Sequence, residues 1–407
     1  MALSASFKTV WAREMQEVFW PQNVWSPQAN FRLEKELKGG DTIKRLIPSK
    51  MVPQNYTRYN DVNFQTGTTT AEQLQVTQTP TIPFVISDLD ELQSTPAARQ
   101  TFTNMASEQM NIIINGFYTA EVVNAASKID ASDFGGTAGN GAVVTPSNIQ
   151  KLFAMAQKKA GRKNVMRYGP GMAPGAANLT PDVYQALLEY LAGKESVLGD
   201  RTGENGHAGQ YMGYDLYVHN GGYWTGTLNL ATNPTAGDTL TLQVQDQTLV
   251  FTFVSSIGAT PGNVLIGGSA AATGANLAAL LTAPGTTTAN GVALVTDAQA
   301  LLFGTTASYG SNVLTITAKG AGAIITTSSL TATTDGWVVG KNISNLLFTQ
   351  KGAIDFVVQR YPKIQIDQAE NRIEEWKIKP YTLFGVKTFS DGAKKMINVK
   401  VDTTSYT

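Results

Sequence analysis

The sequence predicts an α+β fold that carries an all-β segment inserted into it. One observation is that amphipathic helical periods alternate with strand-like stretches from distant parts of the chain. The other is that charge nearly disappears between residues 222 and 336, where five charged residues stand among 115, whereas the chain of 407 has 31 basic and 31 acidic residues. Because charged sequence continues on both sides, we interpret this segment as a domain placed in a loop of a larger frame.

The frame opens with a helical stripe over residues 4–19, which Pro21 ends. An extended aromatic stretch with Trp20 and Trp25 follows. One interpretation is a helix that packs on its own domain, and the other is an arm that packs on a neighbouring molecule. The apolar residues of the stripe are Phe7, Val10, Trp11, Met15, Val18 and Phe19.

Residues 40–90 contain strands without a core of their own. The stretch 41–49, DTIKRLIPS, is short and β-like, and residues 55–88 are mostly polar and rich in threonine and glutamine. A long two-stranded polar arm is only marginally stable in water by itself. We therefore expect this arm to lie on a partner surface, which belongs either to the same chain or to another copy.

The strongest helix signal begins at Thr95-Pro96, an N-cap followed by proline at the first helical position. Its apolar period continues to about Ser127, which predicts ~30 residues and a rod of ~45 Å. Such a rod is a spine rather than one member of a compact bundle. Its apolar positions are Phe102, Ala106, Met110, Ile113, Phe117 and Ala120.

The remaining frame is predicted as two more helices and several strands. Each helix starts at a Thr-Pro pair, Thr145-Pro146 or Thr180-Pro181, and the glycines and prolines between them, at 167–178, predict a loop. The other expected elements are a strand at 209–220, a short helix and then a strand within 342–368, and strands at 371–389 and 394–401 with a turn at Ser390-Asp391-Gly392 between them.

The charge-poor segment has short strands that alternate apolar residues with Thr or Gln and are bounded by Gly and Thr, with one brief helix at 274–283. This texture indicates a small β-sandwich or β-barrel. The predicted strands are 239–245, 248–254, 263–268, 291–296, 312–318 and 323–327.

No catalytic, cofactor or metal-binding set is recognisable in the sequence. There is no cysteine, and the two histidines, His207 and His219, belong to no metal-ligand spacing. The stretch GWVVGKN at 336–342 is one residue shorter than a phosphate loop and lacks the Ser or Thr after Lys341. We therefore predict that the protein is not an enzyme and holds neither cofactor nor metal.

Two charged clusters each have two interpretations. Asp88, Asp90 and Glu91 either bind a cation or stabilise the start of the long helix. A basic group either faces DNA or an acidic neighbour, or is a solvated helix end, where lysines are common. The basic group consists of Lys158, Lys159, Arg162, Lys163 and Arg167.

The formal net charge is zero, so no global charge drives the chain onto nucleic acid or an anionic membrane. No apolar run approaches the ~20 residues of a membrane helix. The N-terminus lacks the apolar stretch of a signal peptide. These features predict a soluble protein that is made in the cytoplasm and not secreted by a standard route.

The order of the pieces carries a family resemblance. An aromatic N-terminal arm and a polar β-arm precede VISDLDELQSTPAARQTFTNMASEQMNIIINGFY, then the helices TPSNIQKLFAMAQK and TPDVYQALLEYL, then GQYMGYDLYVHN and the final YTLFGVKTFSDGAKKMINVKV. In this order the chain resembles the major capsid protein of a tailed bacteriophage with the Hong Kong 97 type of fold. More narrowly, it is similar to short-tailed-phage coat proteins that carry an inserted β-domain.

The resemblance implies a phage capsid fold made of an N-terminal arm, an extended β-loop, a spine helix, and peripheral and axial domains around an inserted all-β domain. The implied divisions are 1–35 for the arm, 36–90 for the extended loop, 91–135 and 366–407 for the peripheral domain, 136–221 and 341–365 for the axial domain, and 222–340 for the insert.

The resemblance also implies a function and partners. Copies would self-assemble as pentamers and hexamers into an icosahedral shell around the phage genome, through a scaffolded procapsid that expands. The implied partners are a separate scaffolding protein, a portal protein and weakly bound double-stranded DNA, without a membrane; the place is the virion, after assembly in the host cytoplasm. Expected intersubunit contacts are Phe7, Trp11, Trp20, Trp25, Tyr56, Tyr59, Phe64, Arg162, Lys163 and Arg167.

Two rival interpretations remain open at this stage. The Thr- and Gly-rich β-segment and the absence of cysteine suit an extracellular adhesin or surface-layer protein, and an enzyme with an appended carbohydrate-binding module is the other. The insert itself has three candidate roles, which are early folding that nucleates the rest, bracing of neighbouring subunits, and binding of a host surface sugar.

Overall fold

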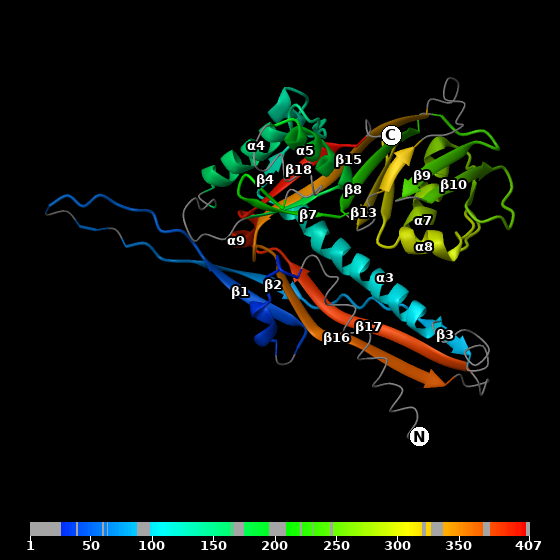
Figure 1. Cartoon of the computed structure of the whole chain (residues 1–407), viewed down its shortest axis with the longest axis horizontal. Coiled ribbons are helices and arrows are strands. Elements are labelled where there is room, and N and C mark those ends of the chain that lie inside the picture. The colour runs from blue at the N-terminus through cyan, green and yellow to red at the C-terminus, as the bar shows by residue number, and fades with distance from the viewer. Residues whose placement is uncertain are drawn as a thin grey trace.

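The computed structural model confirms the predicted α+β class, with helices and four separate sheets among the residues that it describes. Its longest dimension comes from a two-stranded arm that projects away from the body (Figure 1). The described residues are 26–37, 40–58, 61–62, 64–87, 98–163, 165, 175–194, 209–219, 222–230, 232–244, 247–319, 323–326, 337–368 and 375–403.

The arm and a three-stranded sheet form one side of the molecule. Their elements are η1 (Arg32–Lys35), β1 (Thr42–Pro48), β2 (Thr69–Gln75), β3 (Phe84–Ser87), β16 (Asp355–Gln368) and β17 (Glu375–Lys387). β1 and β2 pair antiparallel, and the sheet has the order β16-β17-β3. Among the described residues, the arm joins a hydrophobic core at its root, where Ile43 and Leu74 pack with Leu33, Val357 and Phe389.

The predicted spine helix is present but ends earlier than expected, and its predicted start at Thr95-Pro96 lies outside the described residues. It is α3 (Ala98–Ala120, 23 residues), followed by η2 (Glu121–Asn124) and β4 (Ser127–Ile129). The prediction that the helix continues to Ser127 is wrong, because Ala125 adopts an extended conformation and turns the chain into β4. α3 runs alongside β17 of the three-stranded sheet (Figure 1) and buries Met110, Ile114 and Tyr118 at intervals of four against Phe384 and its neighbours.

A nine-stranded sheet forms the centre of the molecule. The part that carries two helices on one face consists of η3 (Ala131–Phe134), α4 (Ile149–Arg162), β5 (Gly175–Leu179), α5 (Pro181–Ala192), β6 (Gln210–Tyr211), β7 (Tyr214–Val218), β15 (Trp337–Gln350), α9 (Ser390–Ala393) and β18 (Met396–Asp402). α4 and α5 bury their apolar sides against β5, β15 and β18, with Phe153 and Phe348 in edge contact at a centroid distance of 5.3 Å.

Several predicted elements in this part are wrong in detail. The expected loop at 167–178 ends in a buried strand, β5, and the expected single strand at 209–220 is the hairpin β6–β7, whose turn residues Met212 and Gly213 both have positive φ. The expected short helix after residue 342 is part of β15. Its side chains are covered on both faces of the sheet, so the strand has a continuous apolar run instead of an alternating pattern. Because such a run fits a helix as well as a buried strand, the sequence pattern alone did not distinguish them. The first helix starts at Ile149 after Asn148, whose side chain accepts the backbone N–H of Thr145.

The charge-poor segment folds around a core of its own. Its elements are β8 (Tyr223–Leu230), β9 (Thr239–Val244), β10 (Gln247–Val254), β11 (Asn263–Leu265), α7 (Ala270–Thr282), α8 (Thr296–Leu301), β12 (Thr306–Gly310), β13 (Val313–Lys319) and β14 (Ala323–Thr326). A four-stranded sheet of order β11-β10-β9-β14 faces β13 and β8 across buried Phe251, Leu242 and Leu314.

Most of the short strands predicted in this segment are present, but two of its helices and one strand differ from expectation. The strand expected at 291–296 has only isolated bridges at Gly291, and α8 begins at Thr296. The helix expected at 274–283 is longer, since the alanines from Ala270 onward favour helix and the Ser269 hydroxyl caps the N–H of Ala272. The segment is therefore not all-β.

One strand of the central sheet, β15, pairs both with the charge-poor segment and with the frame. Its residues Trp337–Asn345 pair with β8, and Ile343–Thr349 pair with β18. The sheet therefore runs without a break from β12 through β13, β8 and β15 to β5 and β7. The charge-poor segment is joined to the frame by shared backbone hydrogen bonds rather than by a single-chain linker.

Candidate assembly interface

The arm presents large apolar side chains that are exposed in the part of the chain that the structure describes. Beyond β1 and β2, the residues at 49–58 and 64–68 hold no regular helix or strand, and Phe64 and Tyr56 are 94% and 69% exposed. Large apolar residues gathered at such exposure mark a contact surface. The other exposed apolar residues of the arm are Leu46, Met51, Val52 and Val62.

Polar bonds hold the two sides of the arm together. The Gln65 side chain donates to the carbonyl of Val52 at 2.6 Å and accepts the N–H of Val52 at 2.9 Å. Closer to the body, the N–H of Ser49 donates to the carbonyl of Thr68 at 2.8 Å. The arm thus keeps an extended shape although it has no core along its outer length.

At its root the arm meets a group of charges. Arg45 lies 2.8 Å from Asp391 and 3.6 Å from the carboxylate of Asp355, and its guanidinium stands 4.9 Å from the centre of the Phe389 ring. Burial raises the pKa of Asp355 to about 6, in spite of Arg45 and of a 2.6 Å hydrogen bond from Asn30. Burial also acts on Asp391, but the hydrogen bond and charge of Arg45 outweigh it and lower that pKa.

The second strand of the arm is held at the same place. Glu72 accepts hydrogen bonds from both the hydroxyl and the N–H of Ser390, the latter at 3.0 Å, and these bonds lower the pKa of Glu72. The element that presents Ser390 packs closely, since a Cβ added at Gly392 would lie 2.0 Å from the carbonyl oxygen of Ala353. A glycine at this position therefore lets α9 pack against the turn that precedes β16.

The segment that precedes the arm is fixed to the body by backbone and side-chain bonds. Asn30 forms a bridge with Asp355, in which the N–H of Asn30 donates to Ile354 at 2.9 Å and the N–H of Phe356 donates back to Asn30 at 3.0 Å. Gln28 is fully buried and bonds the side chain of Asn178. Residues 28–31 therefore tie the chain to β5 and β16 before the arm begins.

The structure separates the members of the predicted basic group. Arg162 and Lys163 end α4 and are exposed, as is Lys158. Lys159 instead turns to Asp133 and to the carbonyl of Lys128. Arg162 and Lys163 are therefore accessible to a partner, and their contact with one stays a prediction.

Of the other predicted contact residues, the structure describes two. Tyr56 and Phe64 both lie on the exposed part of the arm, as noted above. The remaining ones lie outside the described residues, and their role stays a prediction. These are Phe7, Trp11, Trp20, Trp25, Tyr59 and Arg167.

The residues that hold the arm in place were not among those expected from the sequence. Gln28, Asn30, Arg45, Glu72 and Asp355 belong to no motif, and their partners stand at least 150 residues away in the chain. Nothing in a single sequence signals such pairs, because each depends on the register of strands that are distant in sequence.

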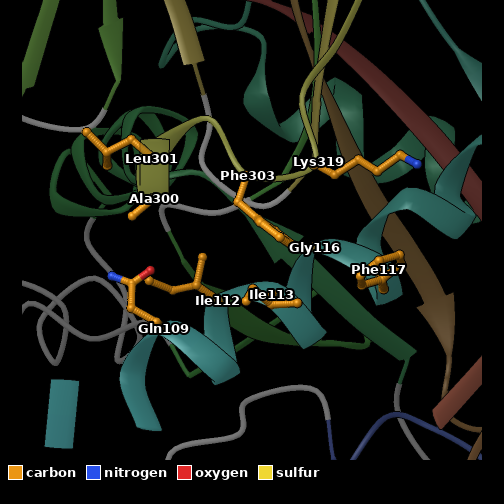
Figure 2. A pocket seen from close by; sticks show the side chains of 10 residues that line it. Gln109, Ile112, Ile113, Gly116, Phe117, Ala300, Leu301, Phe303 and Lys319 are labelled. Carbon is orange, nitrogen blue, oxygen red and sulfur yellow. The ribbon is translucent and has the colours of Figure 1, made fainter. Parts of the chain in front are cut away.

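Two hollows on the described surface lie beside the charge-poor segment and at the arm root. Figure 2 shows the one between α3 and the charge-poor segment, where Phe303 points toward Gly116 and Ile113; its free volume of about 20 Å³ leaves room for about one water molecule. A polar hollow of about 410 Å³ at the arm root is lined by the charges already described, including Arg45, Asp355 and Asp391. Among the described residues no group of His, Asp and Glu is placed to hold a metal ion.

A comparison with solved structures connects this geometry to a known fold. The structure named "Mycobacterium phage Che8" matches with a TM-score of 0.51 and 11% identity, over 93% of this chain and 90% of that one. The capsid of the cyanophage P-SCSP1u matches with a TM-score of 0.49 and 9% identity, over 92% and 87% of the two chains. The mature capsid of bacteriophage PhiM1 matches with a TM-score of 0.47 and 9% identity, over 93% and 87%.

The chain therefore shares its fold with the mycobacteriophage structure. No family model matches the sequence, and no curated protein matches it. The shared fold therefore comes with almost no shared sequence. None of the described helices has the length and apolar character that crossing a membrane requires.

Proposed function

We propose that the chain is the major capsid protein of a tailed phage and that its copies assemble into the icosahedral shell around the genome. The observation that carries this proposal is the exposed arm. An arm with Phe64 and Tyr56 in water, without a core beyond Ile43 and Leu74, gains stability only when another surface covers it. A second copy of the same chain supplies such a surface in a closed, repeating assembly.

The proposed domains follow the divisions implied by the sequence. An arm at 1–35, an extended loop at 36–90, a peripheral domain at 91–135 and 366–407, and an axial domain at 136–221 and 341–365 would surround an insert at 222–340. The separate hydrophobic cores around Phe251, Phe153 and Phe384 support a division of this kind. Pentamers and hexamers would form through the axial parts.

The proposed partners follow from the same function. A separate scaffolding protein would guide the first closed shell, which later expands, and a portal protein would occupy one vertex. Packaged double-stranded DNA would make weak and non-specific contacts, since the formal net charge of the chain is zero. Assembly would take place in the host cytoplasm, and the finished protein would reside in the virion as a structural and not a catalytic component.

Expression with and without a candidate scaffolding protein tests this function. The expected product is uniform closed particles with scaffold, seen by negative-stain microscopy. Sedimentation of the same samples measures the share of the chain that is assembled. Folded monomers in both samples, at concentrations where related shells form, would count against the proposal.

A further inference from the structure

The arm leaves the body at one pair of opposite charges. Arg45 and Glu72 face each other across β1 and β2, and the pair one step closer to the body on the same face is Ile43 and Leu74, which is buried. Further out, Leu46 is largely exposed and the arm residues bond only one another among the described contacts. Among the described contacts between arm and body, those of Arg45 and Glu72 lie furthest out along the arm.

Both members of this pair reach the same short helix. Arg45 binds Asp391 at 2.8 Å, and Glu72 accepts the N–H of Ser390 at 3.0 Å as well as the Ser390 hydroxyl. Ser390 and Asp391 are consecutive at the start of α9. α9 therefore holds both β1 and β2, and these contacts form a clamp. Contacts to both strands oppose rotation of the arm about its long axis and also a change of its angle to the body.

A buried carboxylate lies beneath the clamp. The side chain of Asp355 is 5% exposed, accepts a hydrogen bond from Asn30 at 2.6 Å and lies 3.6 Å from Arg45. This arrangement connects the clamp to the fixed segment that precedes the arm.

The strength of the clamp is modest. An exposed ion pair such as Arg45–Asp391 contributes little by itself, and the contact with the Phe389 ring adds a similarly small amount. Together, the weak contacts of Arg45 and Glu72 hold the arm in one direction relative to the body. A contact of the arm with another surface can still replace them.

We propose that Arg45, bound to Asp391, and Glu72, bound to Ser390, form a latch that fixes the direction of the arm relative to the body. When the latch opens, the pivot of the arm moves inward to the Ile43–Leu74 pair. The arm beyond the latch spans roughly 40 Å, so a rotation of ~10° displaces its tip by ~7 Å. The use of this movement in shell building rests on the function proposed above, whereas the latch is a property of the free subunit.

Distance measurements between two spin labels on the unassembled protein test the latch. The chain has no cysteine, so labels attach only where cysteines are introduced, here by Tyr56→Cys on the arm and Lys158→Cys on α4, both exposed positions. The unmodified latch is expected to give one narrow distance distribution. Arg45→Gln combined with Glu72→Gln is expected to widen it about twofold, because the arm loses its outermost contact with the body.

Two further variants make the result decisive. Lys44→Gln removes a charge from the adjacent, exposed position of β1 and is expected to leave the distribution unchanged. Asp391→Asn removes the partner of Arg45 on α9 and leaves the sequence of the arm unchanged. This variant is expected to widen the distance distribution between the two labels. An unchanged width in both latch variants, or equal widening by Lys44→Gln, would overturn the proposal. Because no assembly is needed, this result stands independently of whether shells form.

Discussion

The side-chain amides of Gln28 and Asn178 bond each other in both directions. Gln28 donates to Asn178 at 2.9 Å and Asn178 donates back at 3.1 Å, although 150 residues separate them. Asn178 also donates to the carbonyl of Leu347 at 3.1 Å. This buried group joins the segment before the arm to two strands of the central sheet.

Loss of Gln28 is therefore expected to weaken the whole subunit. Gln28→Ala leaves the amide of Asn178 buried without this partner, which lowers the free energy of unfolding by about 2 kcal/mol. Urea denaturation of the free subunit measures the loss. Gln185→Ala is the control, because Gln185 is exposed and bonds only Glu189 in the next turn, and it is expected to change stability by less than ~0.5 kcal/mol. Equal effects of the two variants would contradict a structural role for Gln28.

Asp355 is expected to make stability depend on pH. Its pKa of about 6 in the folded chain lies above the usual 3.8, so the folded state binds this proton more tightly than the unfolded state. The resulting contribution is complete below pH ~4 and is lost as the pH rises through 6.

Asp355→Asn removes this titration. Relative to the variant, the unmodified chain is expected to lose on the order of 1 kcal/mol of stability between pH 5 and pH 7.5. Denaturation curves at several pH values give the difference. Asp61→Asn, at an exposed arm position, serves as the control and should show no such trend. A pH-independent difference between Asp355→Asn and the unmodified chain would show that Asp355 does not titrate in this range.

The arm tip is expected to matter for assembly and not for folding. Tyr56→Ser combined with Phe64→Ser removes apolar surface that the free subunit leaves in water, so the free energy of unfolding should change by less than ~0.5 kcal/mol. The share of chain in closed particles, measured by sedimentation, should fall strongly. Val295→Ser, at an exposed apolar position outside the arm, should leave that share unchanged. Normal assembly of the double variant would exclude the arm tip as a contact.

If the proposed insert is a separate folding unit, its core can be weakened alone. Phe251→Ala should destabilise the segment around β9 and β10 by about 3–5 kcal/mol, and Phe153→Ala should do the same around α4 and α5. Hydrogen exchange of peptides from the two regions measures each effect. Faster exchange in both regions with either variant would indicate one cooperative unit and would argue against the proposed division.

The elements with strong local signals could be predicted from the sequence. Pro181 at the first position of α5 and the four-residue spacing of Met110 and Ile114 in α3 specify helices locally. The alternation of Leu240, Leu242 and Val244 specifies a half-buried strand. The fold class followed from such elements.

The wrong predictions of secondary structure fall where the local sequence pattern is ambiguous and contacts with distant strands decide the conformation. The apolar run Leu346-Leu347-Phe348 fits a helix as well as a strand, and pairing with β18 and β5 decides for the strand. The arm root was beyond prediction for a related reason. Glu72 meets Ser390 and Arg45 meets Asp391 only because β1, β2 and α9 come together in space.

The way in which the chain enters and leaves the charge-poor segment has a practical consequence. β8 and β15 are neighbouring antiparallel strands, and Leu230 lies opposite Trp337 at their far ends. Residues opposed in this way have Cα atoms ~5 Å apart. A foreign domain whose own termini lie that close could be grafted between these two residues with no added linker.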